Sequence, residues 1–308
     1  MKLNRENKFV VNENIKLVNF LSQHCPYLEN KFLDLFKENR IKVNGKFVFE
    51  DVELSVGDFI IIVTPRELEP KVNTEFEIIY EDEWFFAVNK SAPLPVHPAG
   101  KYYFNTLTNL LIEKGVGDFY PVNRLDRETT GIVIFAKNKE MATKLGNLFS
   151  KNNVKKKYLA VCFGKMKEKN FVVDEPLLKK EFKEIRNHVV VDVEGKKCET
   201  EFNVLKSNDK FSLVEVKPKT GRSHQIRVHL AYIEHPIVGD KQYGIDESIF
   251  SRFSKENISD EEILKKVLTL NHLLHCFEIE FVHPVTKEIV KICAEMSKDM
   301  KTFINKNF

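Results

Sequence analysis

The sequence lacks the features that mark membrane proteins and disulfide-bonded proteins. No apolar run approaches the roughly 20 residues that span a bilayer, and the first residues are polar, without the apolar centre of a signal peptide. No CxxC pair occurs, which favours reduced thiols over a disulfide framework or a zinc site. The five cysteines are scattered singly, at Cys25, Cys162, Cys198, Cys276 and Cys293. We therefore expect a cytoplasmic protein without a membrane partner.

Motifs for common cofactors are also missing. The sequence has no glycine-rich dinucleotide fingerprint, no P-loop and no HExxH pair, so we expect neither a cofactor nor a metal ion. His224 and His229 lie on one predicted helix, but their spacing does not match that of a helical zinc pair. We expect both to be structural hydrogen-bonding groups. A metal-dependent hydrolase that uses His224, His229 or His275 is an alternative, and it predicts activity that is sensitive to a chelator.

The charge of the chain is nearly balanced, which gives little indication of a partner. The net charge is only +3. Its distribution is more informative, because residues 136–157 contain seven lysines and a single acid, Glu140, and end in Lys155, Lys156 and Lys157. Such a run is either a solvated surface or an RNA-binding edge, and the charge alone does not decide between them.

The chain is predicted to contain two domains, at residues 1–65 and 76–308. Two helical patterns open the first domain and short strands follow. Between these strands Asn44-Gly45 is a strong signal for a tight hairpin. Residues 64–75 contain two prolines and no apolar periodicity, and we interpret residues 66–75 as the linker.

The second domain is rich in short β-strand patterns. Runs such as GIVIFAK at 131–137 and FSLVEVKP at 211–218 recur along it. They are interleaved with a few helical patterns, notably at 105–114 and 224–234. This order favours an α+β fold with a large, mainly antiparallel sheet.

Two segments of the second domain carry candidate chemistry. In residues 123–137, Asp126 lies between two arginines in a loop before an apolar strand. A loop aspartate of this kind is usually a cap or a surface charge. In residues 214–244, however, Arg222 stands just before a predicted helix, and Ser223 is placed to cap that helix. An arginine fixed in this way suits a catalytic partner.

Three strings occur in a fixed order along the second domain. They are Arg124-Leu125-Asp126 with Thr130-Gly131, then Lys157–Val161, and then Gly221–Leu230. Together they resemble the RluA-type family of pseudouridine synthases, and the similarity runs from about residue 76 to 290. Leu274-His275 also fits the family pattern. The sequence departs from it at Asn123, where the family commonly has a histidine.

The first domain has a resemblance of its own. Its two helices and its Asn44-Gly45 hairpin are similar to the S4-type RNA-binding module of ribosomal proteins. Many such modules are basic, whereas residues 1–75 carry slightly more acidic than basic side chains. We expect the module to bind RNA weakly, to bind it through one face, or mainly to orient the enzyme. A small appended domain without RNA contact is the alternative.

The family resemblance implies an enzyme that isomerises uridine in RNA. Asp126 corresponds to the essential nucleophilic or basic aspartate, and Arg222 to the basic residue that pairs with it. Tyr158 corresponds to the aromatic residue that stacks on the target base. Because burial alone would protonate a carboxylate, we expect Arg222 to keep Asp126 ionised inside a pocket from which water is largely excluded.

Other residues are expected to bind the substrate. By the resemblance, Arg124 helps to displace the flipped base, and Leu274 lines the pocket. The lysines at 155–157 adjoin Tyr158, so we expect them to engage the phosphates on either side of the flipped nucleotide.

The target RNA and the chemical route stay open. Large-subunit ribosomal RNA is the first expectation and tRNA the second, with a monomeric protein. Asp126 attacks the sugar, attacks the base, or removes the C2′ proton. A non-catalytic RNA-binding or ribosome-assembly protein on the same fold is the alternative. That alternative has no need for Asp126, Tyr158 and Arg222 together.

Overall fold

The computed structural model describes residues 4–180, 188–244, 252 and 258–308. The chain divides into two compact units. The first unit comprises the residues up to 71 together with 97–109, and the second comprises 72–96 and the chain from residue 110 onward. In the part of the chain that is described, no helix has both the length and the apolar character needed to cross a membrane.

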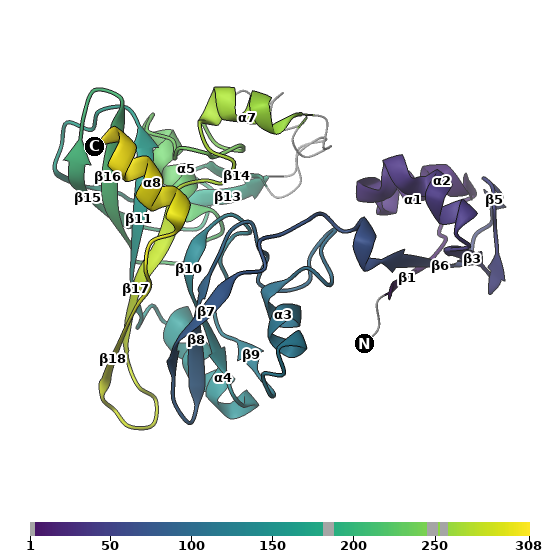
Figure 1. The fold of residues 1–308 in the computed structure, drawn as a ribbon, viewed down its shortest axis with the longest axis horizontal. Helices are drawn as coiled ribbons and strands as arrows, with labels where there is room; N and C mark the ends of the chain where they lie inside the picture. Colours follow the sequence, from purple (N-terminus) through teal and green to yellow (C-terminus); the bar gives the residue numbers. More distant parts are fainter. Residues whose placement is uncertain (1–3, 181–187, 245–251, 253–257) are drawn as a thin grey trace. The chain divides into compact units, whose positions relative to one another are not determined.

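The first unit is built on a four-stranded antiparallel sheet (Figure 1). The strand order is β1 (Asn4–Val10), β6 (Phe59–Pro65), β3 (Ile41–Val43) and β4 (Lys46–Phe47). Around it lie α1 (Leu17–His24), α2 (Phe32–Lys37), the 3-10 helices η1 (Pro26–Lys31) and η2 (Arg66–Leu68), and the pair β2 (Ile15–Lys16) and β5 (Glu53–Leu54). The predicted hairpin is confirmed, because Asn44 and Gly45 join β3 to β4 with φ angles of 49° and 81°.

The core of the first unit lies between its helices and one face of its sheet. Ile41, Ile60 and Ile62 are fully buried on that face. They belong to the same cluster as Leu17 of α1 and Leu35 of α2. Successive strand residues point to opposite faces of a sheet. The residues that alternate with these isoleucines therefore face away from the helices.

A loop from later in the sequence belongs to this unit because a buried carboxylate holds it. Glu69 accepts hydrogen bonds from the backbone N–H groups of residues 103–105 at 2.9–3.0 Å. The guanidinium of Arg5 also donates to the carbonyl oxygen of Gly100, at 3.2 Å. These contacts attach residues 97–109 to the first unit although the strands of the second unit begin earlier in the sequence.

The second unit contains a large sheet that is mainly antiparallel, as the sequence predicts. Only the pairing of β10 with β17 is parallel among its described strand pairs. The strand order is β12 (Asn170–Val173), β15 (Thr200–Ser207), β16 (Phe211–Pro218), β11 (Lys155–Phe163), β17 (Leu274–Val282), β10 (Thr130–Ala136), β8 (Phe85–Lys90) and β7 (Phe76–Glu81). In addition β18 (Ile289–Cys293) pairs with β17, β9 (Tyr120–Pro121) pairs with β10, and β13 (Leu177–Lys180) pairs with β14 (His188–Val191).

The helices of the second unit flank this sheet. They include α4 (Lys139–Ser150), α7 (Asp260–Val267) and α8 (Lys298–Asn307). Both predicted helices form, as α3 (Leu107–Glu113) and α5 (Gln225–Tyr232). The predicted cap of α5 is wrong, however. Its N-cap is His224 in place of Ser223, with a left-handed φ of 55° and without a side-chain capping bond.

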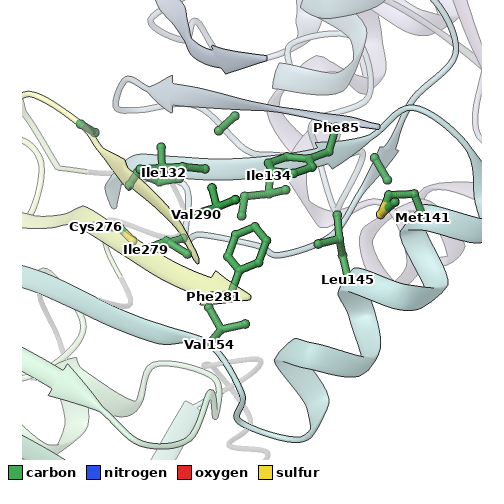
Figure 2. Packing of buried hydrophobic residues seen from close by; sticks show 14 residues of the cluster. Phe85, Ile132, Ile134, Met141, Leu145, Val154, Cys276, Ile279, Phe281 and Val290 are labelled. Carbon is green, nitrogen blue, oxygen red and sulfur yellow. The ribbon is translucent and has the colours of Figure 1, made fainter. Parts of the chain in front are cut away.

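One face of the central strands packs against α4 (Figure 2). Phe85, Ile134 and Phe281 come from three different strands and meet Met141 and Leu145 of the helix. Every residue of β10 is buried, which fits a central strand that is covered on both faces. The loop that enters β10 is therefore attached to the most rigid part of the fold.

Candidate active site

Asp126 lies in the loop that leads from β9 into β10. The side chain of Asn123 pairs with the backbone of β10, accepting from the N–H of Ile134 at 2.8 Å and donating to the carbonyl oxygen of Ile132 at 3.2 Å. On the other side of Asp126, the carbonyl oxygen of Arg127 accepts from a backbone N–H at 2.8 Å. The loop is thus held on both sides of Asp126, whose side chain remains 33% exposed. Its carboxylate is fixed and still accessible to a substrate.

A glycine lets the strands that carry the site approach one another closely. Gly131 has a φ of 106°, and a Cβ atom there would lie 2.1 Å from the carbonyl oxygen of Cys276. Only glycine fits such a position. Cys276 on β17 is also the direct partner of Tyr158 on β11. This close packing aligns Tyr158 with the beginning of β10, four residues after Asp126.

The arginine that pairs with Asp126 is Arg227, and the predicted pairing with Arg222 is wrong. Nη1 of Arg227 lies 2.8 Å from Oδ2 of Asp126. Arg222 is exposed and makes no ion pair within the described ranges of the chain. The reason is geometric. Arg222 precedes the left-handed residue at the start of α5, whereas Arg227 lies within the helix, on its buried side.

Arg227 is itself clamped by a second carboxylate. Asp240 accepts from Nε and Nη2 of Arg227 at 2.7 and 2.9 Å, and Gln242 accepts from Nη2 at 3.3 Å. The guanidinium also lies 4.9 Å from the ring centroid of Tyr243. The side chains of Arg227 and Asp240 are only 9% and 1% exposed. A bidentate pair of this kind fixes the orientation of the guanidinium, so Asp126 meets a rigid cation.

The charges around Asp126 keep it ionised. Burial by itself would raise the pKa of Asp126, but His224, in its protonated form, and Arg227 outweigh burial and lower the pKa to about 2. Nε2 of His224 lies 3.8 Å from Oδ1 of Asp126. Burial lowers the pKa of His224, so this ring is neutral at pH 7. Arg227 is therefore the cation that maintains the carboxylate at neutral pH.

Tyr158 is part of the same cluster of residues. Burial raises the pKa of its hydroxyl well above the usual value, and the nearby Cys276 and the charge of Asp126 raise it further. The hydroxyl therefore stays protonated at neutral pH. Its ring packs against a buried cluster that includes Ile226 and Leu274. The structure thus brings Tyr158 close to Asp126, as expected, and it places Leu274 in the packing around the tyrosine ring.

The three lysines before Tyr158 do not form the continuous exposed edge that we expected. Lys155 pairs with Glu280 at 2.7 Å, and Lys157 pairs with Glu278 at 2.8 Å. Lys156 points the other way and is buried, and it donates to the carbonyl oxygen of Thr220 at 3.3 Å. The alternation of side chains along a strand separates the three ammonium groups. Arg124, in contrast, is fully available, since its side chain is exposed.

A buried ionic cluster lies beneath the Asp126 loop, and sequence reasoning missed it. Glu128 accepts from Lys241 at 2.6 Å and from Arg127 at 2.5 Å. His272 lies 3.9 Å from Glu128 and hydrogen-bonds to Thr129 at 2.7 Å. The only sequence signal was the presence of charged residues directly beside Asp126 and within the string GDKQYG that follows α5. Such residues are expensive to bury unless they are paired.

Lys90 is a second buried charge that the sequence analysis did not single out. It is 1% exposed. Its ammonium group donates to the carbonyl oxygens of Ser91, Leu94 and Arg127 at 2.8, 2.8 and 3.2 Å. Burial lowers its pKa to about 7. Lys90 thus joins the end of β8 to the loop that carries Asp126.

Two of the histidines considered for a metal site make structural hydrogen bonds. The ring of His229 is bonded to Thr200 at 2.9 Å and to the carbonyl oxygen of Glu175 at 3.0 Å. The ring of His275 is bonded to Thr130 at 2.8 Å and to the carbonyl oxygen of Ala294 at 3.3 Å. Across the described ranges, no group of three or more histidine, cysteine or acidic side chains is arranged to hold a metal ion. The geometry gives no support to a metal-dependent hydrolase.

Buried histidines predict a loss of stability in mild acid. Burial lowers the pKa of both His272 and His275 to about 4, from 6.5. As the pH falls below 6.5 the unfolded chain binds protons that the folded chain does not bind, so this stabilisation is lost between pH 6.5 and about 4. Each ring should lower the free energy of unfolding by about 1.4 kcal/mol per pH unit in this window. Carboxylates with lowered pKa values change the free energy of unfolding only at a lower pH than this window.

Urea unfolding across this window measures the slope. His275→Asn should be less stable than the parent protein at neutral pH, and the difference should shrink as the pH falls, because the variant has a clearly shallower pH dependence. An unchanged slope in this variant would show that other groups cause the loss.

Comparison with known proteins decides the family. A sequence family described as RNA pseudouridylate synthase matches residues 85–232, a range that includes Asp126, Tyr158 and Arg227. The ribosomal large subunit pseudouridine synthase C of Buchnera aphidicola subsp. Baizongia pistaciae is 31% identical over 305 residues, which cover 95% of this chain and 93% of the relative. The chain belongs to the RluA-type family of RNA pseudouridine synthases. The predicted family and enzyme class are thereby confirmed.

A second relative agrees with this membership, and a solved structure agrees with the fold. The mitochondrial tRNA pseudouridine(32) synthase of Saccharomyces cerevisiae is 37% identical over 252 residues, which cover 81% of this synthase and 54% of the relative. The solved structure of human RNA Pseudouridylate Synthase Domain Containing 1 has a TM-score of 0.58 at 23% identity, and the match covers 78% of this chain and 98% of the human one. This structural similarity confirms the predicted fold.

Proposed function

We propose that this synthase converts uridine to pseudouridine in large-subunit ribosomal RNA, with Asp126 as the catalytic carboxylate. The observation that carries the proposal is the ion pair of 2.8 Å between Asp126 and Arg227, beside Tyr158. The pair keeps one carboxylate deprotonated in a partly buried position that a nucleotide can still reach. A protein that only binds RNA has no need for this arrangement.

The reaction breaks the N1–C1′ bond of uridine and forms a C5–C1′ bond to the same sugar. C5 loses a proton and N1 gains one, so no atoms are exchanged with a cofactor. Asp126 attacks C1′, attacks C6, or removes the C2′ proton. All three routes begin with an ionised carboxylate, which is the state that Arg227 maintains.

The target base must leave its stack before it can react. Flipping a base costs a few kcal/mol, and stacking on an aromatic ring returns about 1–3 kcal/mol. In this proposal Tyr158 supplies the ring, which its proximity to Asp126 supports. In this proposal Arg124 fills the space that the flipped base vacates, which its exposed position two residues before Asp126 supports. Asp126, Tyr158 and Arg227 thus have direct roles, whereas Arg222 is available for the RNA backbone.

Substitutions at Tyr158 should distinguish the contribution of its ring to turnover from that of its hydroxyl. We expect Tyr158→Ala to lower turnover by about 5- to 150-fold, the equivalent of a stacking energy of 1–3 kcal/mol. Tyr158→Phe keeps the ring and should retain much more activity. Single-turnover rates on an RNA fragment measure both effects, and equal rates for the two variants would remove the stacking role.

The choice of ribosomal RNA follows from the relatives. The Buchnera relative, which is matched over 93% of its length, is named for the large ribosomal subunit, whereas the tRNA-modifying relative is matched over only 54% of its length. Pseudouridine maps of ribosomal RNA and tRNA from cells with and without the gene would test this choice. A site lost from ribosomal RNA supports the proposal, and a site lost only from tRNA overturns it.

We further propose that the first unit is an S4-like RNA-binding module and that the enzyme acts as a cytoplasmic monomer. The Asn44-Gly45 hairpin and the two short helices support this module type. Point substitutions on its surface test this role in the full-length chain, with thermal unfolding as the check that the fold is intact.

A further inference from the structure

One face of the sheet in the first unit is apolar, aromatic and exposed. It is the face that points away from α1 and α2. Val10, Phe47 and Phe59 are 56%, 46% and 38% exposed on it. Val10 pairs directly with Phe59 across β1 and β6, and Phe47 pairs with Lys42 across β4 and β3. Lys42 in turn pairs with Ile61 of β6. These five residues form one continuous surface, which we call the outer-face patch.

This patch is unusual for a protein surface. Single exposed apolar residues are common and need no explanation, but a contiguous exposed set marks a binding surface. The patch crosses all four strands of the sheet. A further aromatic residue, Phe49, follows β4 and is 64% exposed. The sheet therefore presents aromatic rings to solvent, where they add no buried area that would stabilise the fold.

Cationic side chains accompany the aromatic rings. Nζ of Lys42 lies 4.5 Å from the ring centroid of Phe47. Lys42 makes no ion pair with a carboxylate among the residues that the structure describes. Lys8 pairs with Ile61 on the same face, and its contact with Glu6 is long, at 3.4 Å, with both side chains 56% exposed. Exposed pairs of this kind are weak, so both ammonium groups are available to an anion.

We propose that the outer-face patch binds a single-stranded stretch of the substrate RNA that flanks the modified uridine. Bases stack on Phe47 and Phe59, and the adjoining phosphates contact Lys42 and Lys8. Aromatic rings on an open sheet together with basic side chains suit unpaired RNA, because every base has a face that can stack. The inference rests on the proposed function, which supplies the RNA.

This mode of binding also accounts for the charge of the module. A module with slightly more acidic than basic residues cannot rely on charge alone to hold a polyanion. Stacking needs few cations, and the patch places Lys42 directly beside a ring. We therefore expect binding with little sequence preference and with a shallow salt dependence.

The test compares variants of the full-length chain. The probe is a fluorescein-labelled oligoadenylate of about 12 nucleotides, which spans a typical single-strand site and offers no uridine to Asp126. The double variant Phe47→Ala/Phe59→Ala should bind about tenfold or more weakly in fluorescence anisotropy. Leu33→Ala is the matched control, because Leu33 is an exposed apolar residue of α2, away from the patch. It should bind like the parent protein.

Two further variants make the test more specific. Phe47→Trp/Phe59→Trp keeps the aromatic surface and should retain binding. Lys42→Gln should weaken binding and lower the dependence of log affinity on log salt by about 0.7, the value for one phosphate contact on a single strand. Unchanged thermal unfolding in all variants would show that the fold is intact.

Other results would overturn the proposal. If the double alanine variant binds the probe like Leu33→Ala, the patch does not bind RNA. If the parent protein self-associates in sedimentation velocity and the double variant does not, the patch is instead a protein interface.

Measurements of turnover separate this inference from the proposed function. With a ribosomal RNA fragment, the double variant should raise KM and leave kcat unchanged. A parent protein that binds the probe but makes no pseudouridine would overturn only the enzymatic proposal.

Discussion

Asp126→Asn should abolish pseudouridine formation, with a fall in turnover on the order of 10³-fold or more. The amide is nearly the same size as the carboxylate, but it cannot act as a nucleophile or take a proton. The surroundings of Asp126 lower its pKa to about 2, so the wild-type carboxylate is ionised throughout the physiological range. The loss should therefore be the same at every pH at which the protein is folded.

Carbodiimide mapping of treated RNA measures this loss. Asp118→Asn is the matched control, because Asp118 is exposed and, like Asp126, precedes β10 in the sequence. It should retain full activity. Equal amounts of product from Asp126→Asn and wild type would remove the catalytic assignment. Inactivity of Asp126→Asn together with normal cell function would instead favour a non-catalytic role in the cell.

The sequence predicted the fold and the loop of Asp126, because both depend on local patterns. Short apolar runs of β-strand character marked the strands, and the string around Asp126 directly precedes the buried strand β10. The two-residue turn at Asn44-Gly45 was predictable for the same reason, since the residues that tolerate positive φ stand next to each other in the chain.

The partner of Asp126 was not predictable in the same way. Arg222 and Arg227 lie in one short string, and both are plausible cations. Which of them meets Asp126 depends on where α5 begins. It begins after a left-handed residue, His224, and not after the capping serine that the sequence suggested. Non-glycine residues are uncommon in that conformation.

Long-range contacts account for the other differences. Glu69 accepts hydrogen bonds from residues 103–105, and no local sequence pattern predicts that contact. The lysine run was interpreted as one surface because it is continuous in sequence. Along β11, however, the alternation of side chains divides it between two faces.

Arg227→Gln should have the largest combined effect on activity and stability, because it leaves Asp126 and Asp240 without their shared cation. Removing one partner of a buried ion pair costs about 3–5 kcal/mol, and the carboxylate of Asp240 is only 1% exposed. The variant should therefore unfold at a lower urea concentration.

The activity of the same variant should depend on pH in a new way. Without Arg227, burial raises the pKa of Asp126. Activity that remains should then be lost as the pH falls through this higher pKa, whereas wild-type activity should stay level until the protein itself is destabilised. Single-turnover rates across the pH range measure the difference.

Arg222→Gln is the matched control, since the exposed Arg222 makes no pair with Asp126. It should keep the wild-type stability and the wild-type pH profile, with a weaker affinity for RNA as its main defect. If the pH profile shifted in Arg222→Gln and not in Arg227→Gln, the cation that keeps Asp126 ionised during the reaction would be Arg222, brought to the carboxylate by the bound RNA.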